Sequence, residues 1–213
     1  MNNDGSIVDY ARQLAESVKL LPDFEIPTSL TRYEMIGPVL VDAILQAGVN
    51  YNSVVAPRVR RLIQCYPYAC LDTLSFLHLL KSRTSCEVLS WRHSEKPRRL
   101  LNLTEWLVAR DVWTICDLHD WLSCESRAEM LLVIRGIGSK TIDYLRNLVG
   151  IPTVAVDRHI RTMIVSVGIP ITDYVEIRSV VSLAAGFLAT RPDYLDHAIW
   201  TYVSRAAKRM VRQ

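Results

Sequence analysis

A turn with two glycines between two helical patterns constrains the fold of this chain more than any other feature. An apolar helical run over residues 131–134 reaches Gly136-Ile137-Gly138, and residues 139–149 then repeat apolar positions at helical spacing. Glycine suits a short turn because it tolerates positive φ and lets another backbone come close. The amides of Gly138 and Ser139 would start the second helix, where N–H groups and the helix dipole favour an anion such as a phosphate. The sequence therefore predicts a compact helical hairpin over residues 128–149.

Two polar residues follow this turn at defined distances. Lys140 stands two residues after Gly138, and Asp157 stands 157 − 140 = 17 residues after Lys140, beyond the loop Gly150-Ile151-Pro152. The combination resembles the helix-hairpin-helix DNA glycosylase superfamily, whose signature is such a hairpin followed by a Gly/Pro loop and an aspartate. The pattern is most similar to the endonuclease III and 8-oxoguanine glycosylase branches, which carry a lysine at the position of Lys140. A weaker resemblance covers residues 40–62 and continues to the C-terminus.

Apolar residues at helical spacing recur in nearly every segment, and the alternation typical of strands is almost absent. We therefore expect an all-α protein. The resemblance implies two lobes with a substrate cleft between them: residues 1–35 and 156–213 form one lobe, and residues 36–155 form a six-helix lobe that ends in the hairpin. Pro57 either kinks its helix or marks the first turn, and residues 81–94 read as a polar link. The patterns place helices at residues 6–21, 34–47, 53–63, 72–80, 96–107, 117–122, 158–167, 174–189 and 193–210.

The resemblance assigns the chemistry to Lys140 and Asp157. Removing a damaged base breaks its bond to C1′ of the sugar, and the base must first leave the stack. The Lys140 amine would form a Schiff base with the opened sugar and promote strand cleavage, which requires a lowered pKa because an ammonium cannot attack. A place in the first turn of a helix and a partly desolvated cleft would both favour the neutral form. The alternative for Lys140 is a solvated lysine that contacts a phosphate.

Asp157 would stabilise the positive charge that develops on the sugar and manage the proton. The other interpretation makes Asp157 the N-cap of the helix that follows it, a role that aspartate fills well. The two roles are compatible, since a carboxylate fixed by cap geometry is well placed for catalysis.

DNA-contacting residues are expected at the hairpin and at an interhelical corner. By resemblance, the corner at residues 46–52 fills the gap left by an extruded base. Gln46, Asn50 and Asn52 are its candidates, because Gly48 stands where the family often has glutamine. An ordinary polar loop fits this segment equally well. The other candidates for contacts with DNA are Arg135, Gly136, Gly138, Ser139, Thr141, Arg158 and, as a packing or phosphate-contacting residue, His159.

No cofactor is expected. Relatives of endonuclease III often hold an iron–sulfur cluster on four C-terminal cysteines, whereas this chain has five cysteines and none after Cys124. The five read as free thiols, and the five scattered histidines show no metal-ligand arrangement. Such hairpins sometimes hold a structural monovalent cation, for which carbonyls around Ile134 and Ile137 are the candidate ligands.

Composition permits DNA binding without requiring it. The chain has 213 residues, half of them hydrophobic, and a net charge of +3, so it can bury a sizeable core and is only mildly basic. Its start shows no targeting pattern, and no apolar run approaches a membrane span. We therefore expect a soluble monomer that binds double-stranded damaged DNA, in the cytoplasm and at the nucleoid of a prokaryote or in the nucleus of a eukaryote.

Three functions remain open. The leading hypothesis is a base-excision repair glycosylase with lyase activity at abasic sites, using Lys140 and Asp157 to remove a damaged and, by resemblance, oxidised base. The second is a monofunctional glycosylase in which Asp157 activates water and Lys140 only binds. The third is a catalytically silent DNA-binding module. The third is disfavoured because phosphate contacts alone do not require both residues, although a shared fold does not establish chemistry.

Overall fold

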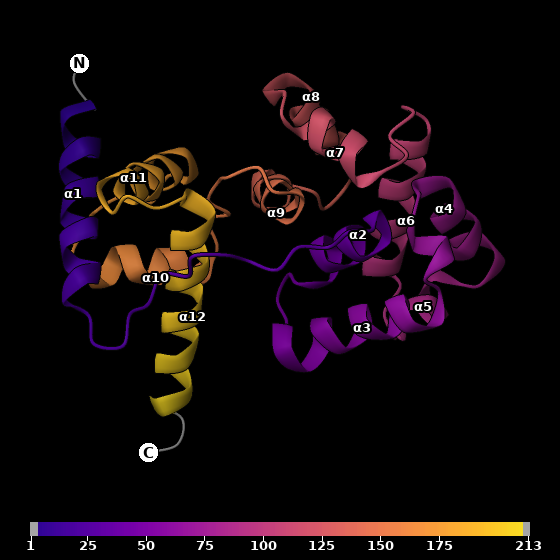
Figure 1. The fold of residues 1–213 in the computed structure, drawn as a ribbon, viewed down its shortest axis with the longest axis horizontal. Helices are drawn as coiled ribbons and strands as arrows, with labels where there is room; N and C mark the ends of the chain where they lie inside the picture. Colours follow the sequence, from indigo (N-terminus) through magenta and orange to yellow (C-terminus); the bar gives the residue numbers. More distant parts are fainter. Residues whose placement is uncertain (1–3, 211–213) are drawn as a thin grey trace. The chain divides into compact units, whose positions relative to one another are not determined.

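The computed structural model describes the backbone of residues 4–210 and the side chains of residues 6–206. Within this range the chain contains twelve α-helices, two 3-10 helices and one π-helix, joined by loops, and no β-strand (Figure 1). The prediction of an all-α protein is therefore confirmed. No helix in this part of the chain is long and apolar enough to cross a membrane.

The described residues form two compact units. The terminal unit comprises the residues up to Thr31 and those from Pro152 onward, and the central unit comprises Arg32–Ile151.

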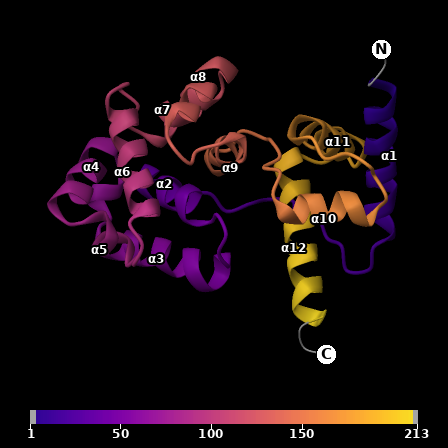
Figure 2. The same cartoon turned by 180° about the vertical axis from the view of Figure 1, so that it is seen from behind.

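The terminal unit is a four-helix cluster in which α1 packs along α11 and α10 packs against α12 (Figures 1 and 2). Its fully buried side chains include Leu14, Ile160, Val181 and Leu195, one from each helix. Apolar stripes on four helices thus meet in one core. The helices are α1 (Asp4–Leu20), α10 (Arg158–Ser166), α11 (Tyr174–Phe187) and α12 (Pro192–Met210).

The central unit is built around α2 (Ile36–Leu45), in which every residue is buried. A helix that is apolar except for one aspartate belongs in the middle of a bundle, and α6 and α9 pack directly against it. The other elements of this unit are η1 (Tyr51–Val55), α3 (Ala56–Cys65), η2 (Tyr68–Cys70), α4 (Thr73–Ser82), α5 (Ser85–Leu89), α6 (Glu95–Val108), α7 (Ile115–Leu122), α8 (Glu125–Glu129), η3 (Met130–Val133) and α9 (Ser139–Val149).

The central unit contains eight α-helices, where six were expected, and two of the eight, α5 and α8, are short. The polar link expected at residues 81–94 contains α5, which begins with a capping box: the Thr84 hydroxyl accepts from the Glu87 N–H, and the Glu87 carboxylate accepts from the Thr84 N–H. Such a box satisfies two helix-end donors, and burial of Val88 and Leu89 adds an apolar anchor. Local capping therefore makes a helix of a segment that looks like a loop by composition.

The segment around Pro57 follows one of the two expected alternatives. Pro57 lies in the first turn of α3, where its missing N–H costs no helical hydrogen bond. A single π-helical turn, η1, precedes it and is capped by Asn50, whose side chain accepts from the Ser53 N–H at 3.1 Å.

Helix α9 is fixed to its neighbours by one buried guanidinium. Arg146 donates to the Leu122 carbonyl at 3.1 Å, to Glu125 at 2.6 Å and to Asp143 at 3.3 Å. Its side chain is only 7% exposed, and burying such a charge is tolerated because acceptors surround it. These contacts hold the position and rotation of α9, and with it the direction of the residues in its first turn.

Candidate functional site

The two-glycine turn lies between η3 and α9. The run expected as one helix through Ile134 ends instead as a 3-10 turn, and the Ile137 N–H closes onto the Ile134 carbonyl at 2.9 Å. Gly136 has φ +88, in the left-handed region, and Gly138 is the N-cap of α9. The first N–H groups of α9 therefore emerge at the turn, where a helix end favours an anion.

Gly136 suits the turn because its φ is positive, and it also leaves room for a neighbouring arginine. A Cβ added there would overlap the Arg99 guanidinium, whereas a Cβ on Gly138 would meet nothing within 4 Å. The Arg99 cation thus lies against the turn, where it adds positive charge to the helix end.

Replacing Gly136 by alanine is expected to destabilise the protein by about 1–2 kcal/mol, because alanine at positive φ is strained and also displaces Arg99. Gly138→Ala is the matched control and should change the free energy of unfolding by less than about 0.5 kcal/mol. Urea unfolding followed by circular dichroism measures both. Equal effects of the two variants would contradict this account of the turn.

Two lysines meet at the C-terminal end of α2. Lys140, in the first turn of α9, donates from Nζ to the Gln46 side-chain oxygen at 3.0 Å. Lys96 of α6 donates from Nζ to the carbonyls of Leu45 and Ala47 at 2.6 and 2.5 Å. Burial, together with the positive charges of Arg99 and Lys140, lowers the pKa of Lys96 to about 8. The site thus holds crowded cations beside a helix N-terminus.

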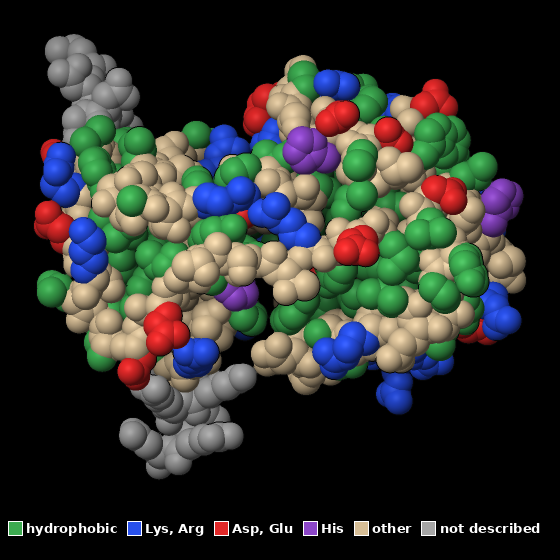
Figure 3. All heavy atoms as spheres, in the orientation of Figure 1, with side chains coloured by type: hydrophobic (Ala, Val, Ile, Leu, Met, Phe, Trp, Pro, Cys, Tyr) green, Lys and Arg blue, Asp and Glu red, His purple; other side chains and the backbone are tan. Residues whose placement is uncertain are grey.

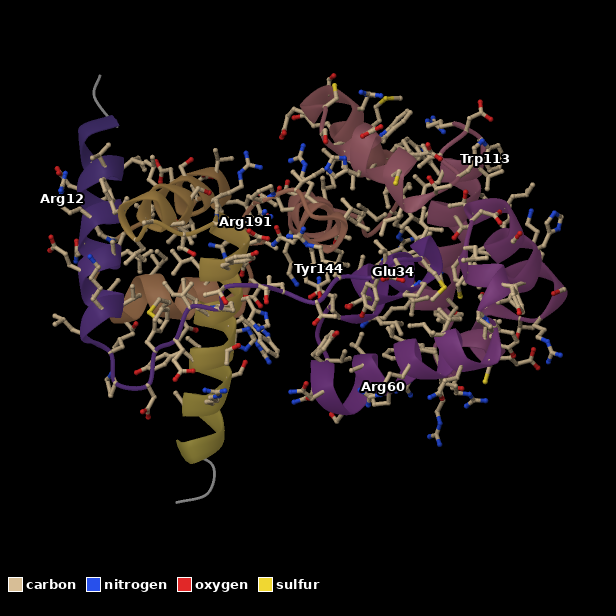
Figure 4. The ribbon with its side chains drawn as sticks, in the orientation of Figure 1. Arg12, Glu34, Arg60, Trp113, Tyr144 and Arg191 are labelled. Atoms are coloured by element: carbon tan, nitrogen blue, oxygen red, sulfur yellow. The ribbon has the colours of Figure 1, made fainter. Side chains whose placement is uncertain are left out.

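A buried carboxyl group lies on α2, one helical turn before Gln46. Asp42 of α2 is 1% exposed and accepts hydrogen bonds from Tyr33 at 2.7 Å, from Tyr51 at 3.3 Å and from Tyr144 at 3.1 Å. Tyr144 extends from α9 toward α2 (Figure 4). Burial raises the pKa of Asp42 above its usual range, although the three hydroxyls partly offset it.

Asp42 and Gln46 are four residues apart on α2, and Lys140 and Tyr144 are four apart on α9. Residues at this spacing share a helix face. Two polar contacts, Asp42–Tyr144 and Gln46–Lys140, therefore join the same pair of facing helices. The hydrogen bond from Tyr144 of α9 to Asp42 of α2 holds these two helices together. It therefore also holds Gln46 and Lys140 in position for their own contact.

Asp157 belongs to the terminal unit and caps α10. One oxygen accepts from the backbone N–H groups of His159 and Ile160 at 2.7 and 3.1 Å, and the other pairs with His159 Nδ1 at 2.8 Å. Burial raises the pKa of Asp157, but these hydrogen bonds outweigh it, so the pKa lies below its usual range. The N-cap prediction is confirmed, and the carboxylate is ionised at neutral pH.

His159 is held on both sides of its ring. Its Nε2 lies 3.3 Å from the Ser204 hydroxyl, and its ring packs edge-on against Trp200 at a centroid distance of 6.2 Å. His159 therefore packs inside the terminal unit and orients the second oxygen of Asp157.

The lowered pKa of Asp157 predicts a pH effect. The carboxylate contributes stability above the usual pKa of a carboxyl group, and this contribution is lost as the pH falls through the lowered value. Asp157→Asn keeps a good N-cap but cannot titrate. We therefore expect wild type to lose more stability than Asp157→Asn on acidification, measured by urea unfolding at neutral and acidic pH. Parallel losses would contradict this assignment.

The remaining predicted DNA contacts lie on the surface of their own units. Gln46 is the one that the structure joins to Lys140. Thr141 is half-buried in the first turn of α9, and its N–H donates to the Gly138 carbonyl at 2.9 Å. The exposed candidates of the central unit are Asn50, Asn52, Arg135, Gly136, Gly138 and Ser139, and that of the terminal unit is Arg158.

Sequence reasoning missed the roles of Lys96, Arg99 and Asp42. In the sequence, Lys96 and Arg99 belong to a basic run over residues 96–99, and such a run is usually a solvated helix face. On the face of the central unit in Figure 3, basic side chains lie in separate small groups. The cations Lys96, Arg99 and Lys140 near the turn therefore indicate a candidate anion-binding site better than the net charge of the chain does.

All five cysteines have free thiols. Among the side chains of residues 6–206, no group of three or more His, Cys, Asp or Glu is placed to hold a metal ion.

Comparison with known proteins identifies one family. The family described as a domain of unknown function, DUF8548, matches residues 93–204, which is more than half of the chain. The chain therefore belongs to the DUF8548 family. No curated protein and no solved structure matches it.

Proposed function

We propose that this DUF8548 protein is a DNA glycosylase with lyase activity at abasic sites, which removes a damaged and, by the family resemblance, oxidised base from double-stranded DNA. The observation that carries the proposal is the placement of Lys140. Its amine stands in the first turn of α9, directly after the two-glycine turn, and is oriented by Gln46 beside a second cation, Lys96. The two-lobed helix-hairpin-helix arrangement that the family resemblance implies is part of this proposal.

The chemistry requires a neutral amine. The damaged base leaves the stack, and Lys140 Nζ forms a bond to C1′ while the bond from C1′ to the base breaks and the base takes up a proton. The C1′–O4′ bond then breaks and O4′ takes up the remaining amine proton, which gives a Schiff base between Lys140 and C1′. Loss of a proton from C2′ then expels the 3′ phosphate, which cleaves the strand, and water releases the lysine.

Asp157 would stabilise the positive charge on the sugar. Its lowered pKa keeps it ionised at neutral pH, and its hydrogen bonds to α10 fix its direction before substrate binds. Preorganised charge of this kind is a large part of enzymatic catalysis.

The turn and its cations supply the contacts with the DNA backbone. N–H groups at the start of α9 and the cations Arg99 and Arg135 suit phosphate oxygens, which position the duplex without reading its sequence. Such contacts predict affinity that falls steeply with salt.

Borohydride trapping tests the proposal directly. Wild-type protein is incubated with a duplex that contains one abasic site, and sodium borohydride is added to reduce any Schiff base to a stable adduct. A covalent protein–DNA complex seen on a denaturing gel is the expected result. Absence of the complex, with folded protein that binds the duplex, would contradict the lyase function.

A monofunctional glycosylase is the second candidate, and the geometry of Asp157 favours it. The carboxylate is fixed and ionised by contacts within the terminal unit alone, and such a group can activate water without an amine. Base release without a trapped complex would support this candidate. Binding with neither reaction would identify a silent DNA-binding protein.

A further inference from the structure

Two neighbouring cations of α6, Lys96 and Arg99, lie near the two-glycine turn. Among the side chains of residues 6–206, no carboxylate pairs with either of them, whereas Arg98 of the same helix pairs with Glu95. Lys96 instead contacts neutral groups, namely two carbonyls at the end of α2 and the ring of Trp91. The positive charges of Lys96 and Arg99 are therefore available to an external anion.

Packing holds Arg99 against the turn. Its guanidinium lies so close to Gly136 that an added Cβ would overlap it. Among the described residues, its buried Nε atom has no hydrogen-bond partner, and the same is true of Gln46 Nε2 at the end of α2. Buried donors without a partner are rare in folded proteins and call for an explanation. Since both atoms are donors, the ligand that suits this place is an anion with several acceptor oxygens.

The N-terminus of α9 adds further donors. Gly138 is the N-cap of this 11-residue helix, whose first N–H groups follow the turn directly and favour negative charge. Burial, together with the charges of Arg99 and Lys140, lowers the pKa of Lys96 to about 8, so Lys96 is largely protonated at neutral pH. A bound anion relieves the repulsion between these cations. The site therefore favours a ligand with two negative charges over a ligand with one.

We propose that Lys96, Arg99 and the first N–H groups of α9 bind the phosphate that strand cleavage expels, which becomes a 5′-phosphate monoester at the break. This inference rests on the proposed function, because it takes Lys140 as the amine that forms the Schiff base. Lys140 bonds to Gln46, which lies between the two residues whose carbonyls hold Lys96. The cations are therefore placed beside that amine.

The elimination step explains the choice of ligand. When a proton passes from C2′ to water, the C3′–O bond breaks and its electron pair stays on the phosphate oxygen. A phosphodiester with one negative charge thus becomes a monoester with three terminal oxygens and close to two charges at neutral pH. The guanidinium fork of Arg99 suits two of these oxygens, and the third remains for Lys96 or for the N–H groups of α9. Stabilising the second charge as it develops would speed strand cleavage.

Binding to strand breaks tests the inference without any lyase reaction. Two nicked duplexes differ only at the break, where one carries a 5′-phosphate and the other a 5′-hydroxyl. We expect wild type to bind the phosphorylated nick about tenfold more tightly, because hydrogen bonds to a charged group are gained. Fluorescence anisotropy at neutral pH and constant ionic strength measures both dissociation constants.

Three substitutions on α6 assign this preference to residues. Arg99→Gln and Lys96→Gln should each reduce it to about threefold or less, since each removes one of the two cations. Arg98→Gln is the matched control: Arg98 lies on the same helix but is paired with Glu95, so the preference should stay that of wild type. Circular dichroism checks that each variant is folded. In the lyase reaction, Arg99→Gln should slow strand cleavage but leave the rate of borohydride trapping near that of wild type.

The outcomes separate this inference from the proposed function. Equal affinity of wild type for the two nicks, or a preference that survives in both folded glutamine variants of Lys96 and Arg99, would overturn the inference even if wild type forms an adduct with abasic DNA. A preference that disappears in millimolar inorganic phosphate would assign the cations to free phosphate and would also overturn it. A preference that depends on both cations, without any DNA adduct, would establish the phosphate site and reject the lyase function.

Discussion

Replacing Lys140 by methionine is expected to slow strand cleavage at an abasic site by about 1,000-fold or more. Methionine keeps a long apolar stem but lacks the amine that the Schiff base needs, so the reaction loses its nucleophile. Single-turnover cleavage of a labelled abasic duplex, with protein in excess, measures this rate. Binding of the same duplex should fall far less than the cleavage rate, since one phosphate contact at most is lost.

Lys81→Met is the matched control for this experiment. Lys81 is also a lysine of the central unit, but it is exposed and pairs with Glu105 of α6 at 2.8 Å. An exposed ion pair contributes little to stability, and cleavage should be unchanged in this variant. A cleavage rate in Lys140→Met within about tenfold of wild type would show that the amine is elsewhere.

Replacing Asp42 by alanine is expected to destabilise the protein by about 3–5 kcal/mol, the largest effect on stability that we predict. The substitution removes the common acceptor of three tyrosine hydroxyls in the interior of the central unit and leaves a cavity beside α9. Urea unfolding measured by tryptophan fluorescence gives the change in free energy. A loss of less than about 1 kcal/mol would contradict the structural role of this cluster.

Asp42→Asn separates charge from shape at the same position. Asparagine keeps an acceptor oxygen and should cost less than alanine. Because burial raises the pKa of Asp42, its contribution to stability declines as the pH rises from the usual range of a carboxyl group through the raised value. The stability of wild type relative to Asp42→Asn should therefore be greater at acidic pH than at neutral pH. The opposite trend would mean that the tyrosines hold an ionised carboxylate with a lowered pKa.

Local signals in the sequence predict the helices and the positions of Lys140 and Asp157 within them. The glycines before Lys140 start α9, and Asp157 starts α10 as an N-cap, because turns and caps depend on residues a few positions apart. Capping also explains why the reading of residues 81–94 as a polar link was wrong: this segment contains the short helix α5, which begins with a capping box. Patterns of composition alone do not reveal such a box.

The surroundings of Lys140 were not predictable because they depend on residues distant in sequence. Tyr144 meets Asp42 across 102 positions, Lys140 meets Gln46 across 94, and Lys96 meets Leu45 across 51. None of these pairs has a local signature. In the sequence, a lysine exposed on a helix face cannot be distinguished from a lysine that binds the end of another helix. Only the tertiary structure shows the partner.

The most direct test of the central claim is to identify the residue that bonds to DNA. After borohydride trapping on an abasic duplex, nuclease and protease digestion followed by tandem mass spectrometry locates the sugar remnant on the protein. The account predicts the remnant on Lys140, with Lys96 unmodified. A remnant on Lys96, on the N-terminal amine or on any other residue, with Lys140 unmodified, would contradict it.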